Sequence, residues 1–230
     1  MGEGQTEAAG CGARGQAMPA FVAFAAYALC NWLLTSRVFP IGTAQAPYCR
    51  DVATLAEGAL FLAVALVASR RPRVLAKPAF VALPCALSLA GAALLALPAA
   101  GSAALATLGI TALLLSAVFM MLSAGCALAR LDARLLPACV LVGLGLSYLL
   151  RFALAGLEGT PALLLYVALQ LCAVFAGRRD VAATLDDLAH GETPEELTLT
   201  NPFSFLPKGH RLFVCLGLFQ LAYGIALSFG

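Results

Sequence analysis

The hydrophobic positions of this chain form long continuous stretches rich in alanine and leucine, separated by short segments that carry charge, proline or glycine. A helix needs about 20 apolar residues to cross the hydrocarbon core of a bilayer, because each residue adds only about 1.5 Å. Continuous stretches favour helices over barrel strands, in which lipid-facing and lumen-facing residues alternate. The pattern predicts membrane-spanning helices at 18–36, 52–69, 78–98, 103–127, 135–155, 160–176 and 212–230.

A longer polar segment, residues 177–211, separates the last two of these stretches. Within it, residues 180–190 place apolar side chains at helical spacing, which predicts a short amphipathic helix: Val181, Leu185 and Leu188. Thr193 and Glu196 follow with the spacing of a helix-capping box. We expect this segment to be a connector that lies against the cytoplasmic face.

Six spans, a cytoplasmic connector and a further span resemble one half of a transporter-like fold followed by the first helix of its second half. We therefore expect an all-α, polytopic membrane protein with a six-helix, major-facilitator-like half and a seventh helix. Residues 1–17 are polar and form the expected cytoplasmic tail. This arrangement suggests that the 230 residues are a fragment or a truncated product of a longer protein.

The composition agrees with a lipid environment. Hydrophobic residues make up 62% of the chain and charged residues 11%, whereas soluble domains have about 25% charged residues. So few charges cannot cover a surface that faces water. The net charge of +2 gives no basis for binding nucleic acid.

The basic residues predict the orientation, because Lys and Arg are retained on the cytoplasmic side. With the N-terminus inside, all but three of the 14 basic residues fall in cytoplasmic segments. The three on the outer side are Arg37, Arg50 and Arg151. We therefore expect a multi-pass protein of the cell membrane with a cytoplasmic N-terminus. Cys49 then lies in an external loop, where a thiol reagent should reach it.

Glu57 is the one acidic residue that lies clearly inside a predicted span. Ionisable groups within a membrane are costly, and they often mark a functional site. Two interpretations are open for Glu57. Its carboxyl is either neutral or hydrogen-bonded to a nearby serine or threonine in a structural role, or it binds a proton or a ligand in an outward-facing cavity.

Three further polar residues are candidates for the same site. Asn31 and Gln170 lie within spans, where side-chain amides most often join neighbouring helices. Arg151 is near the outer end of the fifth span, where it either extends to the interface or pairs with Glu57 or an anion. Tyrosines within the spans, such as Tyr27, could line a cavity with these groups.

The remaining chemistry gives no basis for catalysis or metal binding. The cysteines are spread singly along the apolar stretches, without a C-x-x-C pair, and His190 and His210 lie outside the spans. We therefore expect small apolar thiols, with no disulfide framework, metal site or cofactor. The sequence has no G-x-S-x-G, P-loop or H-E-x-x-H motif, so we do not expect an enzyme.

One stretch near the C-terminus resembles a known family. It runs from Asn201-Pro202-Phe203 through Pro207-Lys208-Gly209-His210-Arg211 and continues to Phe219, Ala222, Tyr223 and Gly224. It looks like the connector and seventh span of the membrane-bound LuxR-type regulators of high-GC anaerobic actinobacteria. In that family a major-facilitator-like membrane block precedes a C-terminal helix-turn-helix. The resemblance implies a sensory membrane domain for an unidentified small molecule.

Two departures affect what the resemblance implies. These residues contain no helix-turn-helix, so we expect none of them to contact nucleic acid. The glycines and aspartate of the transporter signature G-x-x-x-D-[RK]-x-G-[RK]-[RK] are absent from residues 66–73, which keep only the basic charges. This loss favours a sensor derived from a transporter. The alternatives are a major-facilitator-type transporter, whole or in part, and a truncated product without function.

Overall fold

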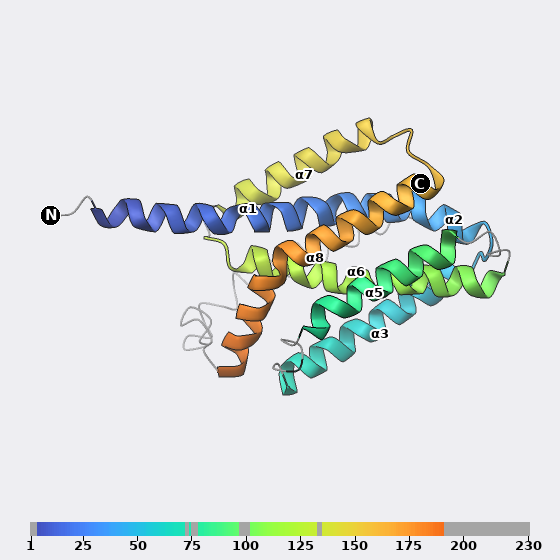
Figure 1. The fold of residues 1–230 in the computed structure, drawn as a ribbon, viewed down its shortest axis with the longest axis horizontal. Helices are drawn as coiled ribbons and strands as arrows, with labels where there is room; N and C mark the ends of the chain where they lie inside the picture. The colour runs from blue at the N-terminus through green and yellow to red at the C-terminus, as the bar shows by residue number, and fades with distance from the viewer. Residues whose placement is uncertain (1–3, 72–73, 75–77, 97–101, 133–134, 191–230) are drawn as a thin grey trace, which may run out of the picture. The chain divides into compact units, whose positions relative to one another are not determined.

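The structure is a computed structural model that describes residues 4–71, 74, 78–96, 102–132 and 135–190. Every element within these ranges is helical (Figure 1). The elements are α1 (Gly4–Leu33), η1 (Leu34–Val38), α2 (Phe39–Thr43), α3 (Cys49–Arg70), α5 (Ala79–Ala96), α6 (Ala103–Ala129), α7 (Leu136–Ala153) and α8 (Gly159–His190).

Five of these helical segments are long and apolar enough to cross a membrane: Ala17–Thr43, Cys49–Ala68, Ala103–Ala129, Leu136–Ala153 and Gly159–Asp187. The apolar part of α5, Phe80–Ala96, is shorter than the others. The all-helical architecture predicted from the sequence is thereby confirmed for the described residues, and five of their helices are long and apolar enough to span a membrane. The arrangement of six spans and one more is not confirmed, since the predicted span 212–230 lies outside the described residues.

Two predicted helix boundaries differ from the structure. The first helix begins at Gly4 and contains Pro19, although we expected the span to begin at residue 18. Hydropathy identifies the part of a helix that lies in lipid, and a helix can continue into water beyond it. Helix α8, which contains the sixth predicted span, likewise continues to His190 without the expected break after residue 176.

The C-terminal part of α8 packs against its own bundle. Val181 and Leu185 are buried in a cluster with Phe80 of α5 and Phe119 of α6. The ring centres of the two phenylalanines are 5.1 Å apart in an edge-to-face arrangement. The apolar spacing in this segment was therefore identified correctly, but it forms the core-facing side of a longer helix.

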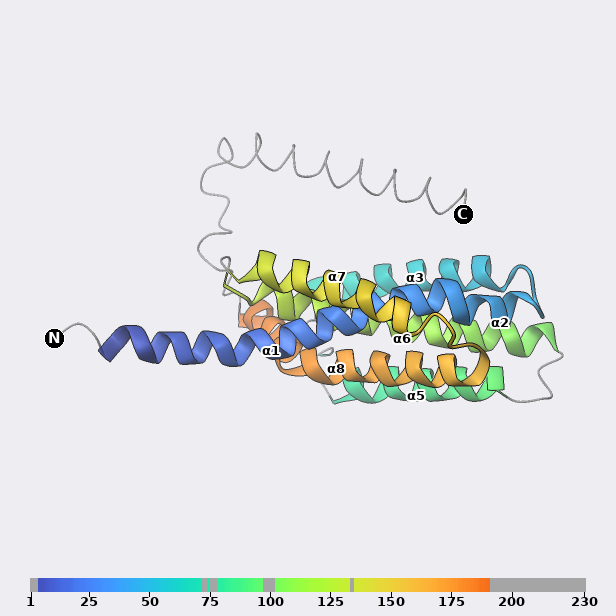
Figure 2. The same cartoon turned by 90° about the horizontal axis from the view of Figure 1, so that it is seen from above.

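Helix α6 is the centre of the described bundle. It packs against α1, α3 and α5 (Figures 1 and 2). Its buried side chains include Ile110, Leu113 and Val118. Helix α7 packs on the other side of α1. Because α6 has neighbours on several sides, it has little surface left for lipid.

Small residues allow these helix backbones to approach closely. A Cβ atom at Gly177 of α8 would lie 2.5 Å from the carbonyl oxygen of Ser123 in α6. A Cβ at Gly91 of α5 would lie 2.8 Å from the carbonyl oxygen of Gly109. A Cβ at Gly143 of α7 would instead meet the side chain of Phe24 in α1, 2.9 Å away. Such contacts are typical of packed membrane helices.

Cys49 differs from its expected place in an exposed loop. It is the first residue of α3, its side chain is buried, and its sulfur lies near Gly42. The neighbouring Tyr48 is 57% exposed. A cysteine introduced at position 48 is therefore a better reporter of membrane sidedness than the native Cys49.

The outward faces of α3 and α7 are apolar. Leu55 and Leu62 on α3 are 77% and 69% exposed, and Phe152 on α7 is 82% exposed. Exposed apolar surface of this extent is unusual for a protein in water. These faces suit contact with lipid chains, as the composition of the chain suggested.

Replacing Gly177 by alanine should destabilise the bundle, because the new methyl group would meet the backbone of Ser123. We expect a loss of about 1–3 kcal/mol, the usual cost of overpacking. Gly125 of α6 is the matched control, since a Cβ there has no neighbour within 4 Å. Gly125→Ala should leave stability unchanged or raise it by about 0.5–1 kcal/mol. Thermal unfolding in detergent measures both, and equal effects would contradict the proposed packing.

Candidate functional site

The candidate site is a small chamber of about 60 Å³ between α1, α3, α6 and α8. Two of the four sequence candidates, Asn31 of α1 and Glu57 of α3, line it together with Tyr27 and Tyr166. The rest of its lining is mainly apolar and comes largely from α6: Cys30, Leu34, Ala117, Met120 and Met121. The chamber has room for about one or two water molecules.

Glu57 reaches the chamber from a partly buried position on α3. The structure gives its carboxyl no ion pair or hydrogen bond with another described residue. The lining contains no basic side chain among the described residues. The carboxyl therefore faces a chamber whose other polar groups are amide, phenol and thiol groups.

Gln170, the third candidate, lies behind the chamber in a fully buried hydrogen-bond network. Its amide nitrogen donates to the carbonyl oxygen of Leu113 at 3.0 Å and to the hydroxyl of Tyr166 at 3.3 Å. Its amide oxygen accepts from the hydroxyl of Ser88 at 2.7 Å. Since Tyr166 also lines the chamber, it joins the two groups of residues.

The hydroxyls of Ser88 and Ser116 make three close polar contacts but have only two protons to donate. Ser88 and Ser116 are 2.7 Å apart, and Ser116 also lies 2.9 Å from the carbonyl oxygen of Pro84. Pro84 lies within α5, where its carbonyl can accept the helical amide bond. Ser88 therefore donates to the amide oxygen of Gln170, and Ser116 donates to the carbonyl oxygen of Pro84 or to the hydroxyl of Ser88.

The hydroxyl of Tyr166 also has a proton to donate. The Tyr166 hydroxyl accepts from Gln170, and no described residue accepts its own proton. Tyr166 is completely buried, so this donor needs a partner such as water or a ligand in the chamber. Glu57 of α3 and Tyr166 of α8 therefore line the same small chamber, and Tyr166 is hydrogen-bonded to Gln170.

A wide helical turn follows the chamber on α1. Segment η1 has π-helical geometry, and the amide of Phe39 bonds to the carbonyl oxygen of Leu34, five residues earlier. Such turns leave carbonyl groups without their usual partners, and they are often found at functional sites. Here the hydroxyl of Ser36 donates to the carbonyl of Trp32 at 2.6 Å. The hydroxyl of Thr35 lies 3.1 Å from the carbonyls of both Asn31 and Trp32.

Arg151, the fourth candidate, lies apart from this chamber. Its guanidinium carbon is 4.1 Å from the ring centre of Tyr148 and 5.9 Å from that of Trp32. It does not pair with Glu57, which was one of the possibilities left open by the sequence. At these distances the contacts are cation–π interactions, which suit a residue at the edge of an apolar region. Arg37 instead pairs with Glu158 at 3.0 Å.

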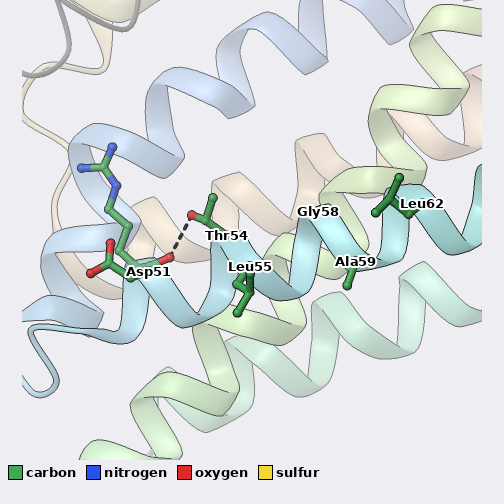
Figure 3. A pocket seen from close by; sticks show the side chains of 7 residues that line it. Asp51, Thr54, Leu55, Gly58, Ala59 and Leu62 are labelled. Atoms are coloured by element: carbon green, nitrogen blue, oxygen red, sulfur yellow. Dashed lines mark hydrogen bonds between the residues drawn. The ribbon is translucent and has the colours of Figure 1, made fainter.

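A larger, open hollow of about 810 Å³ lies along α3. Its described lining comes from this one helix and includes Arg50, Asp51 and Thr54 at one end (Figure 3). The Thr54 hydroxyl donates to the carbonyl of Arg50 at 2.8 Å. We take the smaller chamber as the candidate site because several helices converge on it and because it contains the intramembrane carboxyl.

The sequence did not identify Ser88 and Ser116 as part of this network. Both are single serines within apolar stretches, and such residues often bond within their own helix, as Ser123 does to Phe119. Their separation of 28 positions has no periodic signal. The only indication of a contact between them was that each is a polar residue on one of two helices, α5 and α6, that form a hairpin.

No family model, curated protein or solved structure matches this chain.

Replacing Gln170 by leucine should destabilise the bundle, because the Tyr166 hydroxyl and Ser88 would lose buried partners. We expect a loss of about 1–2 kcal/mol, within the range for hydrogen bonds between membrane helices. Thr111→Val is the control, since the Thr111 hydroxyl bonds only to Thr107 in the same helix. Thermal unfolding in detergent compares the two. Equal losses would show that the network does not join the helices.

Proposed function

We propose that this chain is the membrane-embedded sensory domain of a LuxR-type regulator, and that the chamber at Glu57 is its sensing site. The observation that carries the proposal is the convergence of Asn31, Glu57 and Tyr166 from three helices on one small chamber. A carboxyl group within a membrane is energetically costly, and such residues usually mark a functional site. The chamber connects this carboxyl to a buried network that reaches α5 and α8.

The size of the chamber restricts what can bind. At about 60 Å³ it is much smaller than the typical 300–1,000 Å³ of a site for a small organic molecule. In this conformation it suits a proton, water or a single small ion. A larger ligand would have to open the wall, and the π-helical turn beside it offers a segment that can change its hydrogen bonding.

The regulator part of the proposal rests on the sequence. Residues 201–213 resemble the connector of LuxR-type membrane regulators, and residues 66–73 lack the glycines and aspartate of the transporter signature. The orientation that we propose, with the N-terminus in the cytoplasm, rests on the distribution of Lys and Arg. A DNA-binding part, if it follows these residues, would then lie on the cytoplasmic side.

The coding sequence beyond Gly230 offers a direct test of the regulator proposal. We expect it to encode the remaining membrane half and then a cytoplasmic helix-turn-helix. A stop codon directly after Gly230, or further spans without a cytoplasmic tail, would contradict this proposal. Neither result would affect the separate expectation for the chamber.

The fluorescence of Trp32, the single tryptophan of the chain, should report events in the chamber. It directly follows Asn31, and its carbonyl accepts the hydroxyl of Ser36 at the π-helical turn. We expect its emission to change with pH in lipid nanodiscs, because protonation of Glu57 alters the hydrogen bonds of the chamber. Glu57→Gln should remove most of this change.

Asp51→Asn is the matched control for that measurement. Asp51 lies on the same helix as Glu57 but is exposed and lines the hollow along α3 instead. It should leave the pH response of Trp32 intact. A response that survives Glu57→Gln, or that disappears equally in Asp51→Asn, would exclude Glu57 as the responding group.

Transport by a major-facilitator-type mechanism is the second candidate, and the hollow along α3 favours it. Its volume of about 810 Å³ is in the range of small-molecule sites, and Arg50 and Asp51 could bind a polar solute. Protein-dependent uptake of a solute into proteoliposomes that is lost in Asp51→Asn would favour transport. A sensor would show binding without such uptake.

A further inference from the structure

A second groove lies between α1 and α8 at the end of the bundle opposite the π-helical turn. Its volume is about 480 Å³, and it is open to the surroundings. Met18 and Val22 form part of the wall on α1, and Phe175 forms part of the wall on α8. Met18 and Phe175 are 66% and 46% exposed, so this wall presents apolar surface outwards.

Two arginines close one end of this groove. Arg178 and Arg179 both line it and are both exposed. Neither forms an ion pair with another described residue, whereas Arg130, which follows the last residue of α6, pairs with Asp187 of α8 at 2.7 Å. The adjacent Asp180 lies in the electrostatic field of Arg130. The groove therefore combines an apolar wall with two positive charges that the described part of the protein does not neutralise.

We propose that this groove binds an anionic phospholipid of the membrane. Its phosphate would lie between the guanidinium groups of Arg178 and Arg179, which can each donate two parallel hydrogen bonds to phosphate oxygens. The first part of an acyl chain would lie along Met18, Val22 and Phe175. Basic pockets between helices on the cytoplasmic side bind acidic headgroups in this way.

The position of the groove along the helices agrees with this ligand. Arg178 and Arg179 follow directly after the apolar stretch of the sixth predicted span, so they lie where the hydrocarbon core meets the headgroups. The distribution of basic residues assigns this end of the bundle to the cytoplasm, and the cytoplasmic leaflet contains the anionic lipids. A free phosphate ion would match the arginines but would leave the apolar wall uncovered.

Native mass spectrometry of the purified chain measures how much phosphatidylglycerol and phosphatidylcholine it retains. We expect preferential retention of phosphatidylglycerol, and a loss of about 30-fold in apparent affinity for it in Arg178→Gln/Arg179→Gln. The matched control is Arg70→Gln/Arg71→Gln, an arginine pair at the end of α3 that is predicted to be on the same side of the membrane. It removes the same charge and should change the affinity by less than about twofold.

Two additional measurements separate a lipid site from general charge attraction. Phe175→Ala changes an exposed wall residue and keeps both arginines, so it should fold normally and still weaken retention by about threefold. Excess inorganic phosphate should not displace the lipid. Equal losses in the two arginine pairs, no loss in Arg178→Gln/Arg179→Gln, an unchanged Phe175→Ala, or displacement by phosphate would each overturn the proposal. If the double arginine variant fails to fold, Phe175→Ala and the phosphate competition decide the question.

Discussion

Close approach of the helix backbones to α6 is the constraint on which the described bundle depends. Within lipid there is little hydrophobic force between helices, so packing and hydrogen bonds must join them. Gly177 brings α8 against the backbone at Ser123, and Gly91 brings α5 against the backbone at Gly109. Larger side chains at these crossings would separate the helices. The buried groups that meet around α6, Gln170 among them, would then be too far apart to bond.

This close packing also explains why the polar groups occur in one connected system. A side-chain amide such as that of Gln170 has two donors and an acceptor, and in an apolar interior each needs a partner. Ser88, the Leu113 carbonyl and Tyr166 provide those partners from three different helices. The network is therefore structural in most of its members. Glu57 differs from them, because its carboxyl faces the chamber and has no such partner among the described residues.

Much of the fold could be predicted from the sequence, because a lipid environment imposes long apolar stretches that are easy to recognise. The prediction was less successful where helices continue beyond the predicted spans, as α1 does towards Gly4 and α8 towards His190. Hydropathy does not report helicity in water. The burial of Cys49 was missed for a related reason: a residue between two apolar stretches can still pack against a neighbouring turn.

The candidate site could be predicted only in part, and the reason lies in how polar groups act between helices. Asn31, Glu57 and Gln170 were recognisable because each is polar within an apolar stretch, but nothing in the spacing of 26 residues between Asn31 and Glu57 shows that they face one space. That convergence is set by the crossings at α6. A proton or ligand at Glu57 would act on Tyr166, whose hydroxyl is bonded to Gln170, and hence on the same groups that hold α5, α6 and α8 together. If Glu57 is the responding group, as we propose, a change in the chamber can reach these contacts between helices through Tyr166 alone.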